Sequence, residues 1–441
     1  MRSTSLAWLA AACHILTATS TYAQSAGSPG SLIAAFQAAR DAGNAGDWKA
    51  ARAALQLALR FSPNHPEALY ALSRTEARLG YGSAAVRTLE RLGTQGAVKQ
   101  VEDDTAFGAI RRTREFKAAA ARLAAAAAPL VRSDTFVVLS DPDFIPEGIA
   151  WDPSDGAFYV GSLSGRGIAR ITGKQASSWV RSDSTRLVQI LGLRADPGRR
   201  RLWVAALTVD TTAPRFFQGP GGWATLEAYE LPTGKLLGRW APDSSGPHLL
   251  NDIAVTSAGD VYLTDSEGSA LYRLAAGVGR LERVHHDPER FVYPNGLTPS
   301  EDQTRLYVAH FEGLNVFDLA TARPALVEVS VPPGVTATGI DGLYACGDGL
   351  VAVQYLLDFS QITHFTLSPD GRSITSARAL ERRHPTQSGP TTGALARDRF
   401  LYIANAQLER LENDQSLKPG TGERSVVLQL PLGRVCTQQR P

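Results

Sequence analysis

One phrase recurs six times between residues 147 and 405, and it constrains the fold more than any other feature of the chain. Each copy opens on a small or polar residue, usually beside a glycine. It continues through a short apolar run and a polar turn to a Leu or Val, an aromatic and an aliphatic residue. The copies start at Glu147, Leu191, Asn251, Asn295, Asp341 and Thr392, at spacings of 44, 60, 44, 46 and 51 residues. A period in the forties with at least two short strands per copy is typical of a β-propeller, so the sequence predicts six blades.

The first residue of each phrase should lie near the axis of this propeller. Equivalent positions in a ring of blades lie at equal height and radius, and the phrase opens the inner strand of its blade. Four of the six residues carry side-chain oxygens, namely Glu147, Asn251, Asn295 and Asp341. Taken singly, Asn and Asp beside Gly are typical turn residues. Taken together at one repeat position, their oxygens predict a site for a hard divalent cation completed by water.

Length and charge exclude several classes of partner. At 441 residues the chain is long enough for two or more domains. Its net charge of +2 supplies no long-range field for nucleic acid or an anionic membrane, so we expect neither as a partner. No segment beyond the N-terminus is apolar enough for a membrane span.

Residues 1–23 have the pattern of a secretory signal peptide. Arg2 supplies the positive charge, and Leu6–Thr17 is an apolar stretch too short to cross a bilayer. A lipoprotein signal ending at Cys13 would leave a very short apolar region. We therefore expect a mature chain that begins at Gln24 and is exported across the inner membrane to the periplasm.

Two cysteines, Cys346 and Cys436, remain after this cleavage. In an oxidising compartment they can pair, which would fasten the C-terminal tail to the fifth blade, but sequence does not give the distance between them. They lie far from other Cys or His residues and therefore do not predict a zinc site.

Residues 24–133 are expected to be helical. Their apolar residues recur at helical spacing, and a 34-residue period is present. Gly46, Ala51 and Leu55 recur as Gly80, Ala85 and Leu89. The period resembles that of tetratricopeptide repeats, whose paired helices pack closely. Residues 31–92 could therefore form helical hairpins that pack on the propeller or a groove for a protein partner, while the Ala-rich end of residues 97–131 is expected to be a connecting helix with little to bury.

The propeller is expected to span residues 134–434 and to close through its two ends. Residues 135–140 (TFVVLS) precede the first inner strand, and residues 425–432 (SVVLQLPL) follow the last. A ring leaves no open strand edge when both chain ends share a blade. The sequence therefore predicts that residues 135–140 form the outer strand of the sixth blade.

Three further residues are candidates for contact with a substrate. The long, Gly- and Pro-rich segment between the second and third phrases contains Phe217 and Trp223, which could cover a ligand or pack on the blade rim. His248 lies three residues before Asn251 and could bind substrate or shuttle protons, although a polar loop residue is the commoner role of such a histidine.

The repeated phrases resemble the SMP-30/gluconolactonase/LRE-like family of six-bladed propellers. The likeness is carried across residues 135–432 by PEGIAWDPSDGAFYVGS, LLNDIAVTSAGDVYLTDS, YPNGLTPSEDQTRLYVAHFEGLNVFDL and GIDGLYA. The resemblance implies one divalent cation, Ca²⁺ first and Mg²⁺, Mn²⁺ or Zn²⁺ as alternatives, held by Glu147, Asn295 and Asp341. It places Asn251 close enough to hold a water or the substrate.

Hydrolysis of a lactone or related ester is the reaction that this resemblance implies. A cation of this kind activates water, and Asp341 could accept the proton while Asn251 positions the reactants. The chain departs from the family at Ile149, where a Pro is common, and at Leu249, where sugar-lactonase members have an Arg. The second departure favours a less polar substrate than a sugar-acid lactone, or none.

Two other functions fit the sequence. The first is a non-catalytic propeller scaffold with a structural cation and a partner-binding helical arm. The second is a strictosidine-synthase-like propeller without a metal, against which the four oxygen-bearing side chains argue. No G-x-S-x-G elbow is present and no Cys stands beside a His, so covalent catalysis has no support.

Overall fold

The chain forms two compact units in a computed structural model. The structure describes residues 30–97, 99–165, 167–181, 189–208, 223–242, 247–321, 325–411, 417–418 and 422–436. One unit contains the helices up to Ala128 together with the segments Pro332–Thr336 and Leu357–Phe359. The other contains the strands and begins at Pro129.

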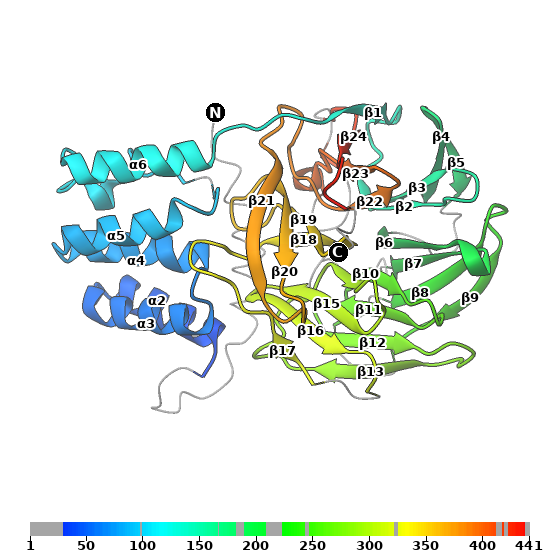
Figure 1. Ribbon diagram of the computed structural model, residues 1–441, viewed down its shortest axis with the longest axis horizontal. Helices are drawn as coiled ribbons and strands as arrows, with labels where there is room; N and C mark the ends of the chain where they lie inside the picture. The colour runs from blue at the N-terminus through cyan, green and yellow to red at the C-terminus, as the bar shows by residue number, and fades with distance from the viewer. Residues whose placement is uncertain are drawn as a thin grey trace. The chain divides into compact units, whose positions relative to one another are not determined.

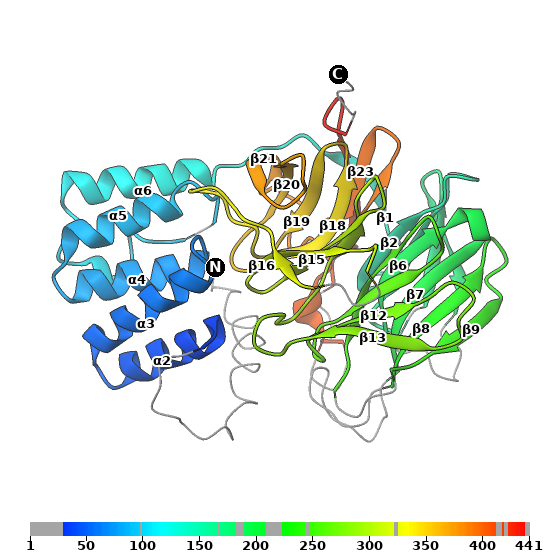
Figure 2. The ribbon, with the colours of Figure 1, turned by 60° about the horizontal axis from the view of Figure 1, so that its bottom comes forward.

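The helical unit is built from successive helices that pack on one another (Figure 2). They are α2 (Leu32–Asn44), α3 (Trp48–Phe61), α4 (Pro66–Arg78), α5 (Gly82–Leu92) and α6 (Arg114–Ala126), with a short 3₁₀ turn at Thr105–Phe107. Gly46 and Gly80, one period apart, follow α2 and α4 with φ angles of 75° and 78°. This left-handed conformation favours glycine after a helix end, which explains why both copies of the 34-residue repeat have glycine at this position.

The last helix of this unit differs from expectation. α6 buries Phe116, Ala119 and Leu123, and it packs against α5 in the same apolar core. The expectation of a connecting helix with little to bury is wrong, because its few large apolar residues all lie on one face between the alanines.

The second unit is a six-bladed β-propeller, as the sequence predicts, and each blade is a four-stranded antiparallel sheet (Figure 1). Blades one to three are β2 (Pro146–Trp151), β3 (Phe158–Ser162), β4 (Ile168–Thr172) and β5 (Gln175–Val180); β6 (Gln189–Asp196), β7 (Arg201–Thr208), β8 (Trp223–Glu230) and β9 (Leu236–Trp240); and β10 (Leu250–Val255), β11 (Val261–Asp265), β12 (Ala270–Leu274) and β13 (Leu281–His286). Blades four to six are β14 (Leu297–Pro299), β15 (Arg305–His310), β16 (Gly313–Asp318) and β17 (Val327–Glu328); β18 (Ile340–Cys346), β19 (Gly349–Gln354), β20 (Gln361–Leu367) and β21 (Ile374–Arg382); and β22 (Gly393–Ala396), β23 (Arg399–Ile403), β24 (Val426–Pro431) and β1 (Asp134–Val138).

The ring of blades is closed. The six inner strands, β2, β6, β10, β14, β18 and β22, contact one another in sequence, and β22 also contacts β2. The outer strand of blade six is β1, which pairs antiparallel with β24 from Asp134↔Gln429 to Val138↔Val426. The prediction that the segment beginning at Thr135 completes the sixth blade is confirmed.

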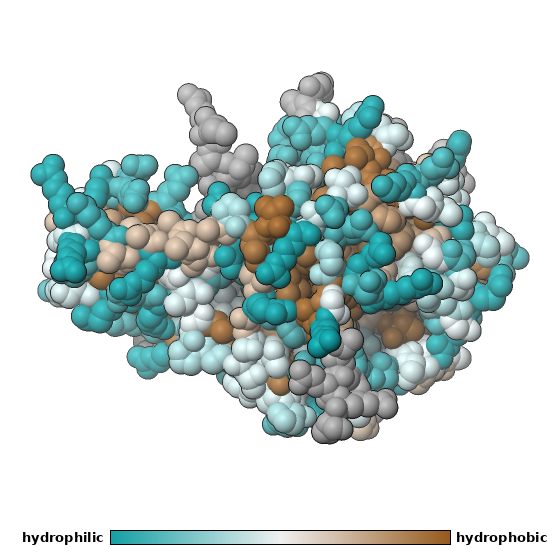
Figure 3. Space-filling view, turned by 45° about the horizontal axis from the view of Figure 1, so that its top comes forward, coloured by the Kyte–Doolittle hydropathy of each residue, from teal (hydrophilic) through white to brown (hydrophobic). Residues whose placement is uncertain are grey.

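Burial falls from the hub to the rim, which explains the composition of the strands. All five residues of β3 are buried, whereas four of the six residues of the rim strand β5 are exposed. The aromatic residue near the end of the phrase, directly before the aliphatic residue, is at most 5% exposed in five blades. These residues are Tyr159, Trp203, Tyr262, Tyr307 and Tyr402. Hydrophilic side chains cover much of the molecular face in Figure 3, with apolar side chains between them.

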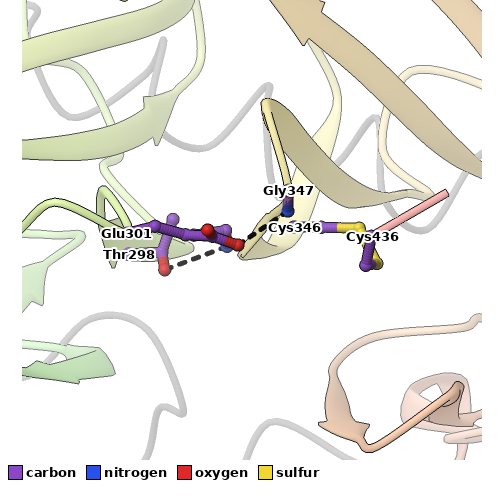
Figure 4. Close-up of a disulfide and its surroundings, with 6 residues drawn as sticks. Thr298, Glu301, Cys346, Gly347 and Cys436 are labelled. Atoms are coloured by element: carbon purple, nitrogen blue, oxygen red, sulfur yellow. Dashed lines mark hydrogen bonds between the residues drawn. A yellow bond between two sulfur atoms is a disulfide. The ribbon is translucent and has the colours of Figure 1, made fainter. Parts of the chain in front are cut away.

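A disulfide joins Cys346, at the end of β18, to Cys436 in the C-terminal segment (Figure 4). The bond closes a loop with a sequence separation of 90 residues. Next to it, the Gly347 amide donates to Glu301 Oε1 at 2.8 Å. The pairing that the sequence leaves open is therefore present, and it fastens the segment after β24 to blade five.

Candidate functional site

The start of the phrase is a β-bulge in four blades. The pairing of the inner strand slips between Glu147 and Ile149 in blade one and between Ile340 and Leu343 in blade five. The same slip occurs in blades two and three. A bulge places an extra residue on one strand and re-aims its side chain, so the first residue of the phrase leaves the regular alternation of the sheet.

Glycines set the distance between neighbouring inner strands. A Cβ on Gly148 would lie 2.0 Å from the Leu191 carbonyl oxygen, and one on Gly296 would lie 2.3 Å from the Asp341 carbonyl oxygen. The Gly296 amide donates to that Asp341 oxygen at 2.8 Å. At these two positions the residue after the phrase opening must therefore lack a side chain so that the next blade can pack closely.

Three of the predicted site residues come together at the hub. Asn295 Nδ2 donates to Asp341 Oδ1 at 3.0 Å between blades four and five. Glu147, in blade one, is close enough to Asp341 in blade five and Asp252 in blade three for both charges to raise its pKa. These three blades are not neighbours in the ring, so their carboxyl groups approach one another only across the channel.

Burial dominates the electrostatics of this cluster. It raises the pKa of Asp341 to about 7 and that of Asp252 to about 6, and it raises the pKa of Glu147 well above its ordinary range. Like charge across the channel raises the values for Asp341 and Glu147 further, while Arg194 lowers that of Asp252. Too little positive charge lies near these carboxyl groups to offset their burial. A bound cation would lower their pKa values by stabilising the charged carboxylates.

Several oxygen atoms of the hub are buried and have no hydrogen-bond partner among the described residues. They include Glu147 Oε2, Asn295 Oδ1, Asp252 Oδ2 and Thr391 Oγ1. The Thr391 hydroxyl opposes the rise in the Glu147 pKa, but it lies outside normal hydrogen-bond geometry. Glu147, Asn295 and Asp341 are 5–7% exposed, so each of these residues keeps a small surface in contact with solvent, unlike fully enclosed core residues. Unpaired buried oxygens cost free energy unless a ligand meets them.

This donor set fits a hard cation that keeps several waters. Its members are two carboxylates, Glu147 and Asp341, and the amide oxygen of Asn295. Within the described parts of the chain, no group of three or more His, Cys, Asp or Glu side chains has the spacing of metal ligands. A cation here would therefore depend on the amide and on water in addition to the two carboxylates.

Asn251 and His248 take different places from these three. We call the first residue of each phrase the ring position of its blade. Asn251, at the ring position of blade three, donates from Nδ2 to Ser266 Oγ at 3.0 Å, which orients its amide. His248 Nδ1 pairs with the buried Asp265 carboxylate, which also accepts the Leu249 amide at 2.9 Å. His248 is thus held within blade three, just before β10.

Of the two candidates in the long segment between blades two and three, only Trp223 lies in the part of the chain that the structure describes. Trp223 opens β8 opposite Thr208, and its backbone alone is described. Phe217 lies outside the described residues, so its expected contact with substrate stays a prediction.

Sequence reasoning missed Asp252 as a member of the cluster. It occupies the position that is glycine in the other five phrases: Gly148, Gly192, Gly296, Gly342 and Gly393. Aligning the second residue of the phrases would have shown Asp252 as the one copy that adds a side chain there.

Tyr293 is a second residue that the sequence did not reveal. It has a φ of 51°, a left-handed conformation that costs a bulky residue roughly 1–3 kcal/mol. Burial raises its pKa, and so do the charges of Glu267, Asp341 and Glu147. Tyr293 therefore lies beside the carboxylate cluster, although only its position two residues before Asn295 could have suggested this.

Comparisons with known proteins are limited to architecture. No profile of a known protein family matches the chain, and no curated protein sequence does. Similar solved structures include a gluconolactonase from Xanthomonas campestris, with 16% identity, a TM-score of 0.46, and coverage of 70% of this chain and 92% of that chain. A calcium-binding protein, regucalcin, from Agrobacterium tumefaciens has 16% identity and a TM-score of 0.45, with 71% and 100% covered. A PQQ-bound aldose sugar dehydrogenase from Streptomyces coelicolor has 14% identity and a TM-score of 0.43, with 69% and 99% covered.

Proposed function

We propose that this protein is a cation-dependent hydrolase of lactones or related carboxylic esters. The observation that carries the proposal is the Asn295–Asp341 hydrogen bond with Glu147 in electrostatic reach of Asp341. Glu147 Oε2 and Asn295 Oδ1 are buried and lack hydrogen-bond partners among the described residues. These residues would hold one divalent cation, Ca²⁺ first and Mg²⁺, Mn²⁺ or Zn²⁺ as alternatives. The resemblance of the repeated phrases to the SMP-30/gluconolactonase/LRE-like family supports the reaction class.

The chemistry divides between the cation and the side chains. A bound divalent cation supplies polarisation of the substrate carbonyl and lowers the pKa of a bound water. Asp341 accepts the proton as the water oxygen attacks the carbonyl carbon, and it returns that proton to the leaving oxygen when the C–O bond breaks. A lactone thus opens to a hydroxy acid. The hydrogen bond from Asn295 fixes the Asp341 carboxylate, and the Asn251 amide positions water or substrate.

Elemental analysis followed by a lactone panel tests this function. We expect one divalent ion per chain, and we expect a chelator to lower the rate of lactone hydrolysis by at least about a hundredfold, because cation activation of water would be lost. Adding Ca²⁺ should restore the rate. A bound ion with no hydrolysis of any lactone or aryl ester would favour the scaffold function instead, and a pulldown that depends on residues 31–92 would strengthen that alternative.

Stability of the chelated protein should depend on pH in a defined direction. The folded pKa values of Asp341 and Asp252, about 7 and about 6, exceed the ordinary value of 3.8, so the folded state holds protons that the unfolded chain has released. Stability is then greatest below the ordinary value and falls as the pH rises toward 7. We expect the Tm of EDTA-treated protein to fall between about pH 5 and pH 8, and Ca²⁺ to restore it at pH 8.

Asp341→Asn provides the control for this pH dependence. Between about pH 5 and pH 8, the Tm of the EDTA-treated variant should fall less than the Tm of the EDTA-treated wild type. The substitution removes one titrating group but keeps an oxygen that can accept the hydrogen bond from Asn295. A Tm that stays level or rises over the same pH range in the chelated wild type would contradict the predicted coupling between these carboxyl groups.

We also propose that the protein is exported to an oxidising compartment such as the periplasm. The Cys346–Cys436 disulfide supports this location, because disulfides persist in such compartments and are rare in the cytosol. In the part of the chain that the structure describes, every helix is too short or too polar to cross a membrane.

A further inference from the structure

The connection between β23 and β24 carries an apolar surface to the end of the channel where the cluster lies. The Ile403 amide donates to the Thr392 carbonyl oxygen at 3.0 Å, so the connection begins directly beside the ring position of blade six. Its described residues include the 3₁₀ turn Leu408–Arg410 (η3) and Leu417, which forms an isolated bridge with Leu411. We call Leu408, Leu411 and Leu417 the leucine wall.

The leucine wall packs on an apolar cluster that extends to the hub. Its three side chains lie against the apolar cluster that contains Leu191, at the ring position of blade two, and Leu249, two residues before Asn251. Tyr293 packs against the same cluster. Among the described residues, each wall residue remains only partly buried and so keeps some apolar surface exposed.

Buried polar contacts hold the wall in place. Arg410 is 5% exposed at its side chain, and its guanidinium bonds to Asp143 Oδ1 at 3.0 Å and to the Pro142 carbonyl oxygen. Gln407 Nε2 donates to the Glu423 carbonyl oxygen at 2.8 Å. These bonds join the connection to the segment before β2 and to its own far end, so the leucines have a fixed position relative to the channel.

We propose that the leucine wall binds the non-reacting part of the substrate, and that this part is an alkyl or aryl group rather than a polyol. This inference rests on the proposed function, because it names the substrate class of the same site. Leucine side chains offer a polyhydroxylated ring no hydrogen bonds, so such a substrate would lose its hydration without compensation. An alkyl chain gains free energy by leaving water at the same surface.

A series of δ-lactones tests the substrate class. The value of kcat/KM should rise at least about tenfold from δ-valerolactone to δ-decalactone, because each buried methylene group contributes up to roughly fourfold. D-glucono-δ-lactone should be a poorer substrate than δ-decalactone. A preference for gluconolactone, or rates independent of chain length, would overturn the inference.

Variants of the wall identify the residues responsible. Leu408→Ala and Leu411→Ala should each lower kcat/KM for δ-decalactone several-fold more than for δ-valerolactone, and Leu408→Met should recover most of that ratio. Leu237→Ala is the matched control, because Leu237 lies on rim strand β9 and is 47% exposed. An unchanged ratio in both wall variants would remove the wall from substrate binding, whatever their effect on stability.

Binding of hydrolysis-resistant δ-lactams separates this inference from the proposed function. Isothermal titration calorimetry of the cation-loaded protein should give a Kd that falls at least about tenfold when a pentyl chain is added to δ-valerolactam. Chain-dependent binding without hydrolysis of any lactone would support the apolar surface and reject the hydrolase. Lactone hydrolysis together with chain-independent binding would do the reverse.

Discussion

Asp341→Ala is expected to lower kcat/KM for lactone hydrolysis by at least about a thousandfold, since a general base alone contributes typically 10²–10⁴-fold. The effect should be this large because Asp341 has two roles, as a predicted cation ligand and as the predicted proton acceptor. The same variant should bind Ca²⁺ more weakly, because it leaves Glu147 as the one carboxylate among the predicted ligands. Steady-state kinetics and calorimetric titration of Ca²⁺ would measure the two losses separately.

Two variants control for unfolding. Asp348→Ala removes an exposed carboxylate from the turn that follows β18 and should leave both kinetics and ion binding unchanged. Asp341→Asn keeps an oxygen that can accept the hydrogen bond from Asn295, so it should fold normally and still lose activity. Hydrolysis within tenfold of the wild-type rate in Asp341→Ala would remove Asp341 from the mechanism.

Gly296→Ala is expected to lower the free energy of unfolding by about 3 kcal/mol, the upper range for overpacking a well-packed interior. The new Cβ would lie 2.3 Å from the Asp341 carbonyl oxygen and 2.7 Å from the Leu343 amide nitrogen. Both are backbone atoms of the next inner strand, so no flexible side chain can yield. Relief of the clash would require blades four and five to separate, which would stretch the 2.8 Å hydrogen bond between Gly296 and Asp341.

Urea denaturation would measure this loss, with Gly279→Ala as the matched control. Gly279 has no heavy atom within 4 Å of an added Cβ and no left-handed φ, so its substitution should change stability by less than about 0.5 kcal/mol. Similar midpoints for the two variants would show that close approach of the inner strands does not depend on the glycine. Since Asp341 is the residue displaced, Gly296→Ala should also weaken Ca²⁺ binding.

The repeat in the sequence was sufficient to predict the architecture and the meeting of distant residues. Blade equivalence converts spacing along the chain into position around an axis, which is why Asn295 and Asp341 could be expected together although 46 residues separate them. The structure brings these two into hydrogen-bond contact and Glu147 into electrostatic reach. Their role as cation ligands stays a prediction, and so do the signal peptide and the helical partner surface.

The features that escaped prediction depend on tertiary structure. The left-handed φ of Tyr293 and the pairing of Cys346 with Cys436 are set by packing, and neither leaves a local pattern. The sequence distinguishes Asp252 only by its position, because the second residue of the other five phrases is glycine. The leucine wall lies in a connection unique to blade six, where periodicity carries no information. The proposed substrate contacts lie in such a unique segment, so the sequence predicted the hub better than its surroundings.

The pairing of β1 with β24 has a consequence for synthesis of the protein. β1 precedes all of the inner strands in the chain, yet its partner β24 follows all of them. A nascent chain still lacking residues 426–431 can therefore assemble five complete blades while the edge of β23 stays open and β1 has nothing to pair with. Closure therefore waits for residues 426–431, and it joins segments almost 300 residues apart, which is slow compared with local folding.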